Sequence, residues 1–155
     1  MNKKNIEAAI KVMTRVKSHE SQLGINPLYM MSYVEKGDGY SIPSTEKEAI
    51  NACGTQCCVS GWLALSPEFK ELGVIQGEDG EAILPEFAKW KEWYQPTAMS
   101  LAKLFDLPAE IVDVLIYDFE ITTIDEVVDR MNSWLAEHKD SEFDYSLPEE
   151  SFCYE

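Results

Sequence analysis

The sequence predicts a mainly α-helical protein, a single compact domain of about six helices with one small β-hairpin. A length of 155 residues fits one domain of common size, and 45% hydrophobic residues suffice for a core. Apolar residues recur every three or four positions over most of the chain, which is the spacing of a helix face. We therefore divide the chain into a helical domain, residues 1–139, and an acidic C-terminal tail, residues 140–155.

The N-terminal helix is predicted over residues 5–19 and has one apolar stripe. The stripe consists of Ile6, Ile10, Met13 and Val16. The lysines of this segment lie largely off the stripe, and docking against the acidic remainder of the protein is their simplest use. Gly24 is expected to end the element. Residues 35–44, with two glycines and a proline, are expected to form an exposed loop.

Two short helices and a hairpin are predicted next. Thr45 and Glu48 form a capping box for a helix that reaches toward Ala52. Thr55 is expected to cap a second, more apolar helix that runs to about Leu65.

The hairpin is indicated by two apolar pieces, residues 74–75 and 82–84, on either side of the glycine-rich turn 77–80. An aromatic cluster follows it, and we assign this cluster to core or interface packing. Its members are Trp90, Trp93 and Tyr94.

Three helices are predicted in the last part of the domain. The first runs from Thr97 to Phe105, and Pro108 suits the first turn of the second. The inner face of the second is expected to consist of Ile111, Val112, Leu115 and Ile116. Thr123 and Glu126 form a capping box for the third. Its apolar face comprises Ile124, Val127, Val128, Met131, Trp134 and Leu135.

The net charge of −15 is concentrated at the C-terminal end. From Asp106 to Glu155 there are 15 acidic residues against Arg130 and Lys139, a net charge of −13, so the preceding residues carry only −2. An acidic surface repels nucleic acid and anionic membranes and attracts basic partners. We therefore expect neither direct nucleic-acid binding nor membrane binding.

A cytoplasmic location is expected. The longest apolar stretch, residues 57–65, is interrupted by Ser60 and Gly61 and is far too short to span a membrane. The N-terminus interleaves charges with apolar residues, unlike a signal peptide. In a cytoplasm the cysteines are expected to be reduced thiols. They are Cys53, Cys57, Cys58 and Cys153.

The segment ACGTQCCVSGW, residues 52–62, is the one recognisable motif. It resembles the pattern Cys-Gly-Thr-x-x-Cys-x-x-Gly-(Trp/His) of a group of small, largely uncharacterised proteins common in bacteriophage and bacterial genomes. Further matches to that group are the stretch Asn-Pro-Leu-Tyr-Met at 26–30, Leu-Phe-Asp-Leu at 104–107 and the pair Ile116-Tyr117. The resemblance covers roughly residues 26–135, and it implies a phage-like accessory protein without an established activity.

In structural terms the motif is expected to build a buried turn. Gly54 lets the backbone turn, Gly61 permits a close approach of another element, and Trp62 fills the core. Cys57 and Cys58 then act as small apolar residues of this turn.

Two chemical alternatives use the cysteines. A zinc site built from Cys53, Cys57, Cys58 and Cys153 would lack the paired C-x-x-C spacing of strong zinc motifs. A cysteine nucleophile would need a base. The only histidines, His19 and His138, lie at the ends of predicted helices, where cations are favoured anyway. No phosphate-binding, zinc-protease or hydrolase motif is present, and we expect neither enzymatic activity nor a cofactor.

The leading hypothesis is a phage-type accessory or inhibitor protein that binds a basic, nucleic-acid-binding surface of a host protein. Carboxylates of the acidic C-terminal third would stand in for DNA phosphates, and the target would be a nuclease, a CRISPR effector or a transcription factor. The predicted binding residues are Glu110, Asp113, Asp118, Glu120, Asp125, Asp129, Glu137, Asp140, Glu142 and Asp144. The alternatives are a thiol-based metal or redox protein or enzyme using Cys53, Cys57 and Cys58, and a helical adapter that binds through apolar contacts. The sequence does not indicate an oligomeric state.

Overall fold

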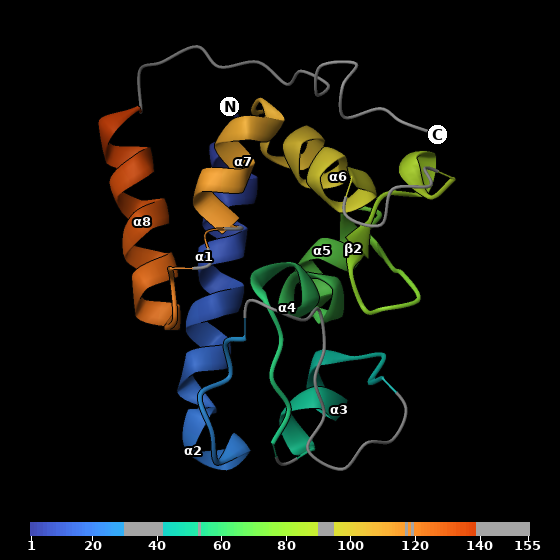
Figure 1. The fold of residues 1–155 in the computed structure, drawn as a ribbon, viewed down its shortest axis with the longest axis vertical. Coiled ribbons are helices and arrows are strands. Elements are labelled where there is room, and N and C mark those ends of the chain that lie inside the picture. The colour runs from blue at the N-terminus through green and yellow to red at the C-terminus, as the bar shows by residue number, and fades with distance from the viewer. Residues whose placement is uncertain (30–41, 53, 90–94, 117, 119, 139–155) are drawn as a thin grey trace.

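The computed structural model describes residues 1–29, 42–52, 54–89, 95–116, 118 and 120–138. Eight α-helices and a two-stranded antiparallel sheet lie in these residues (Figure 1), which confirms the mainly α fold. The aromatic cluster around Trp93, the tail from residue 140 and most of the expected loop at 35–44 fall outside the described residues. No helix in the described ranges combines the length and the apolar character needed to cross a membrane.

The elements follow one another in the order shown by the colours of Figure 1. They are α1 (Lys3–Ser18), α2 (Glu20–Leu23), α3 (Glu46–Asn51), α4 (Val59–Leu65), α5 (Pro67–Glu71), β1 (Ile75–Gln76), β2 (Ala82–Ile83), the 3₁₀ helix η1 (Pro85–Phe87), α6 (Gln95–Phe105), α7 (Ala109–Ile116) and α8 (Ile124–Glu137).

Helix α1 confirms the predicted N-terminal helix and packs against α8, α4 and α6. Basic side chains of α1 form ion pairs with the elements around it. The Arg15 guanidinium binds Glu46 of α3 at 2.7 Å and Glu68 of α5 at 2.6 Å, and Lys17 lies 3.5 Å from Asp125 of α8. Arg15 and Lys17 of α1 therefore dock against acidic residues of the same chain, as expected for cations beside the apolar stripe.

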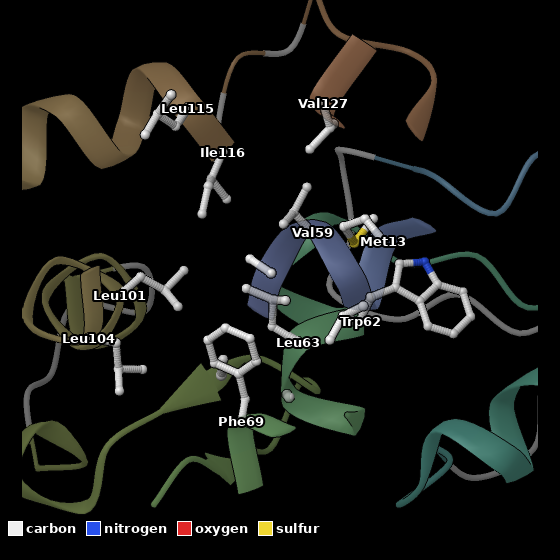
Figure 2. Close-up of a cluster of buried hydrophobic side chains, with 14 of the residues drawn as sticks. Met13, Val59, Trp62, Leu63, Phe69, Leu101, Leu104, Leu115, Ile116 and Val127 are labelled. Carbon is white, nitrogen blue, oxygen red and sulfur yellow. The ribbon is translucent and has the colours of Figure 1, made fainter. Parts of the chain in front are cut away.

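Helix α4 is the centre of the core, because every one of its seven residues is buried. Side chains from α1, α5, α6, α7 and α8 gather around it (Figure 2). Trp62 is fully buried, and its indole Nε1 donates a hydrogen bond to the Pro27 carbonyl at 2.8 Å. The Ser60 hydroxyl accepts a hydrogen bond from the Ala82 N–H at 3.1 Å. The polar side-chain atoms of the buried helix α4 are thus hydrogen-bonded, as buried polar groups need to be.

The segment before α4 differs from the prediction. Thr55 does not cap α4, because its hydroxyl donates to the Ala52 carbonyl at 2.8 Å and so closes the end of α3. Helix α4 begins only at Val59, after Cys58, which makes no side-chain capping hydrogen bond. The residues in between are extended, and Cys57 forms an isolated parallel bridge with Leu28. Pairing of Cys57 with Leu28, which is distant in sequence, competes with an earlier helix start.

Most other local predictions hold, and α2 and α5 are additional helices. The inner face of α7 is an exception, because Val112, Leu115 and Ile116 are buried as predicted but Ile111 is only half-buried. The Thr45 and Thr123 hydroxyls accept hydrogen bonds from the N–H groups three residues on, at 3.1 and 3.3 Å, and so begin α3 and α8. The hairpin is confirmed, with Ile75 opposite Ile83. Ser66 caps α5.

The hairpin turn is closed by the side chain of Glu81, which folds back over it. Glu81 is only 8% exposed, and its carboxylate accepts a hydrogen bond from the Asp79 N–H at 3.1 Å. Burial raises the pKa of this carboxyl. A Cβ placed on Gly77 would lie 1.6 Å from Glu81 Oε1 and 2.2 Å from its Cδ. Gly77 is therefore required by the space that Glu81 occupies.

We expect Gly77→Ala to destabilise the protein by about 2 kcal/mol, because the whole Glu81 side chain must leave its position. In a Glu81→Ala background the same change should be neutral or stabilise by about 0.5 kcal/mol, since alanine lowers the entropy of the unfolded chain. Urea unfolding of the two single variants and the double variant measures this coupling. Equal costs of Gly77→Ala in both backgrounds would contradict the steric explanation.

Candidate functional site

The structure describes seven of the ten carboxylates predicted to bind a partner. They lie on α7, on α8 and on the connection between these helices, which pack against each other (Figure 1). Asp140, Glu142 and Asp144 fall outside the described residues. The seven differ in exposure and in partners, so they do not form a uniform row.

Five of the seven are exposed, and Asp125 is the one among them that faces a lysine. The other four are Glu110 on α7, Glu120 on the connection, and Asp129 and Glu137 on α8. In the described part of the chain, no lysine or arginine forms an ion pair with any of them. Within the described ranges their charge has no ion-pair partner and contributes to the field outside this surface.

Two others are held by cations of the chain itself. The Arg130 guanidinium donates to Asp118 at 2.6 Å and also to the Val114 carbonyl at 3.0 Å. This pairing lowers the pKa of Asp118, and the Glu120 N–H, which also donates to its carboxylate, acts in the same direction. Asp125 is 72% exposed and lies 3.5 Å from the Lys17 ammonium. Asp118 in particular ties the α7–α8 connection to α8.

Asp113 is half-buried on α7 and has a perturbed acidity. Its pKa is raised from 3.8 to about 6, mainly by burial and in addition by the nearby Glu110 carboxylate. A carboxylate that has lost part of its hydration without gaining a cation is unfavourable for the folded state.

The carboxylates are dispersed and do not converge on a point. No three histidine, cysteine, aspartate or glutamate residues in the described ranges lie close enough to hold a metal ion. Asp125 and Asp129, one helical turn apart, are separated by about 6 Å along the axis of α8. Charges dispersed in this way attract a cationic surface.

The sequence reasoning missed one exposed residue of this surface, Val114. Its side chain is 57% exposed, the highest value among the large hydrophobic residues that the structure describes. The available signal was the composition of α7, AEIVDVLI, where six of eight residues are apolar. That is more than one helix stripe can bury.

The described cysteines lie in the core and not on the surface. Cys57 and Cys58 are 0% and 3% exposed, respectively. Burial raises the pKa of Cys57 well above its usual range and that of Cys58 to about 11. Both thiols are therefore protonated at neutral pH, which disfavours nucleophilic attack and metal binding. Their positions favour a packing role, whereas Cys53 and Cys153 fall outside the described residues.

The segments that carry the family resemblance meet in the fold. The Cys57 N–H donates to the Pro27 carbonyl and the Tyr29 N–H donates to the Cys57 carbonyl, both at 3.0 Å. The Asn-Pro-Leu-Tyr stretch and the Cys-Gly-Thr motif thus form one structural unit. Comparison with protein-family models, curated proteins and solved structures found no match to this chain. The resemblance to small phage and bacterial proteins stays a prediction.

Asp113→Asn is expected to stabilise the protein at pH 8 by about 1 kcal/mol, after allowance for solvent screening of a half-exposed group. Because the pKa in the folded state is raised, the protonated carboxyl favours folding. That stabilisation is complete below the unfolded pKa and is lost as the pH rises through about 6. Urea unfolding at pH 8 and at about pH 4 should show the gain only at pH 8.

The matched control for this prediction is Glu71→Gln, which removes an exposed carboxylate of α5 and should change stability by less than about 0.5 kcal/mol at either pH. An equal gain for Asp113→Asn at both pH values would show that its ionisation is not the cause.

The burial of Cys57 and Cys58 predicts slow thiol chemistry. In a Cys53→Ser/Cys153→Ser variant, which keeps only these two thiols, labelling by a disulfide reagent should be at least about tenfold slower in the native state than in denaturant. Stopped-flow absorbance measures both rates. A native thiol that reacts as fast as the thiols of the denatured chain would contradict this prediction and would support the alternative of a thiol-based metal or redox protein.

Proposed function

We propose that this protein binds a basic, nucleic-acid-binding surface of another protein through the carboxylates of its C-terminal third. The observation that carries the proposal is the exposure of Glu110, Glu120, Asp129 and Glu137 without a cation partner in the described ranges. In the N-terminal part, by contrast, Glu46 and Glu68 are engaged by Arg15 in structural ion pairs.

The partner class follows from the charge. Surfaces that bind DNA or RNA present lysine and arginine side chains to phosphates, and dispersed carboxylates can occupy such a surface in place of the phosphates. With the resemblance to phage proteins, a cytoplasmic host nuclease, CRISPR effector or transcription factor is the natural target. The protein would act as an inhibitor by occupying the site and would need no catalytic machinery of its own.

The experiment is a pull-down from bacterial lysate with the tagged protein at low salt, followed by identification of the bound proteins. Captured partners are then challenged with added DNA and with salt. We expect recovery of a nucleic-acid-binding protein that is released by DNA, and by salt between about 50 and 500 mM, because screening weakens interactions between exposed charges.

Two matched variants test which carboxylates matter. The pair Glu120→Gln/Asp129→Asn should lower retention of the partner about tenfold, which is the effect of two lost charge contacts. The pair Glu7→Gln/Glu71→Gln removes the same net charge from α1 and α5 and should leave retention unchanged. Retention that is indifferent to salt, or equal losses for the two pairs, would refute the proposal.

A further inference from the structure

Helix α7 carries more apolar side chains than the core covers. Six of its eight residues are apolar, and four of these are buried: Ala109, Val112, Leu115 and Ile116. Ile111 is half-buried and Val114 is 57% exposed. A helix that is apolar on nearly all sides is normally enclosed, whereas the described residues leave Val114 on the outward side of α7 exposed.

The outer face of α7 combines this apolar surface with negative charge. At 100° per residue, Glu110 and Val114 lie at the centre of the face, Ile111 on one side and Asp113 on the other. Arg130, which reaches α7 from α8, is engaged by Asp118 and by the Val114 carbonyl. We define the α7 outer face as Glu110, Ile111, Asp113 and Val114.

We propose that the α7 outer face is a docking site for a basic amphipathic protein segment, in which an apolar side chain is flanked by lysine or arginine. The inference rests on the proposed function and makes it more specific. The apolar side chain of the partner covers Val114 and Ile111, while its cations meet the Glu110 and Asp113 carboxylates. Binding then has an apolar component that a purely phosphate-like surface lacks.

Charge complementarity selects this occupant over a second copy of the chain. A symmetric dimer through α7 would bring the same patch of both subunits together and would place Glu110 and Asp113 of one copy near those of the other. Like charges in a desolvated contact repel each other. A basic segment does the opposite, because it supplies a cation to Asp113, which is already half-desolvated in the free protein.

Two synthetic peptides of about 14 residues, long enough to form a helix on binding, serve as probes. One is built of leucine and lysine with helical periodicity, and the other has every leucine replaced by alanine at the same number of lysines. Fluorescence anisotropy with the labelled peptides and the full-length protein at low salt measures the affinities. We expect the leucine-containing peptide to bind about fivefold tighter, from burial of roughly half a valine side chain.

Val114→Ser should abolish the advantage of the leucine-containing peptide, and it keeps the helix propensity of the position nearly unchanged. The matched control is Ile75→Ser on β1, whose side chain is 45% exposed in another part of the surface. It should leave the advantage intact. Circular dichroism of both variants checks that the fold is retained.

Equal affinities of the two peptides, or equal effects of Val114→Ser and Ile75→Ser, would overturn this inference and leave the acidic binding function standing. Failure of both peptides to bind at low salt would overturn both proposals together. A dimer that sedimentation detects for the wild type and not for Val114→Ser would identify a second copy as the occupant and would equally overturn the inference.

Discussion

The complete burial of α4 is the constraint on which the rest of the structure depends. A helix buried on every side needs neighbours on every side, and α1, α3, α5, β1 and β2 all contact it. Its polar side-chain atoms need partners as well. The Pro27 carbonyl accepts hydrogen bonds from Trp62 Nε1 and from the Cys57 N–H. These bonds hold the segment before α4 beside residues 27–29. This arrangement places Cys57 and Cys58 inside the protein and explains why their thiols are protonated.

Electrostatics divides the molecule into two unlike parts. In the N-terminal part, cations of α1 hold neighbouring elements together. Arg15 binds two carboxylates, which raises the pKa of its guanidinium and lowers that of Glu68. In the C-terminal part the described cation, Arg130, is engaged by Asp118. Glu110, Glu120, Asp129 and Glu137 face solvent and form no ion pair with a described lysine or arginine. Their field extends about 10 Å at moderate ionic strength.

The two kinds of contact proposed for this surface act at different ranges. Exposed carboxylates such as Asp129 steer a basic partner from a distance and lose strength in salt. The apolar contact at Val114 acts only on close approach and is insensitive to salt. Asp113 contributes to both kinds of contact, because its carboxylate is charged and also partly desolvated. A surface of this kind favours basic partners that also present an apolar side chain, which bare phosphate mimicry would not require.

The sequence by itself determined the mainly helical class, the Thr45 and Thr123 caps, the position of the hairpin turn and the uneven charge. These follow from side chains and backbone groups that meet along one helix or one turn. Tertiary structure decided the rest. Thr55 closes α3 instead of beginning α4, because Cys57 pairs with Leu28, a contact between residues far apart in the chain. The ion pair of Asp118, the half-burial of Asp113 and the exposure of Val114 likewise depend on how α7 and α8 pack. Burial depends on how all the elements pack together, so it cannot be predicted from the local spacing of residues along the chain.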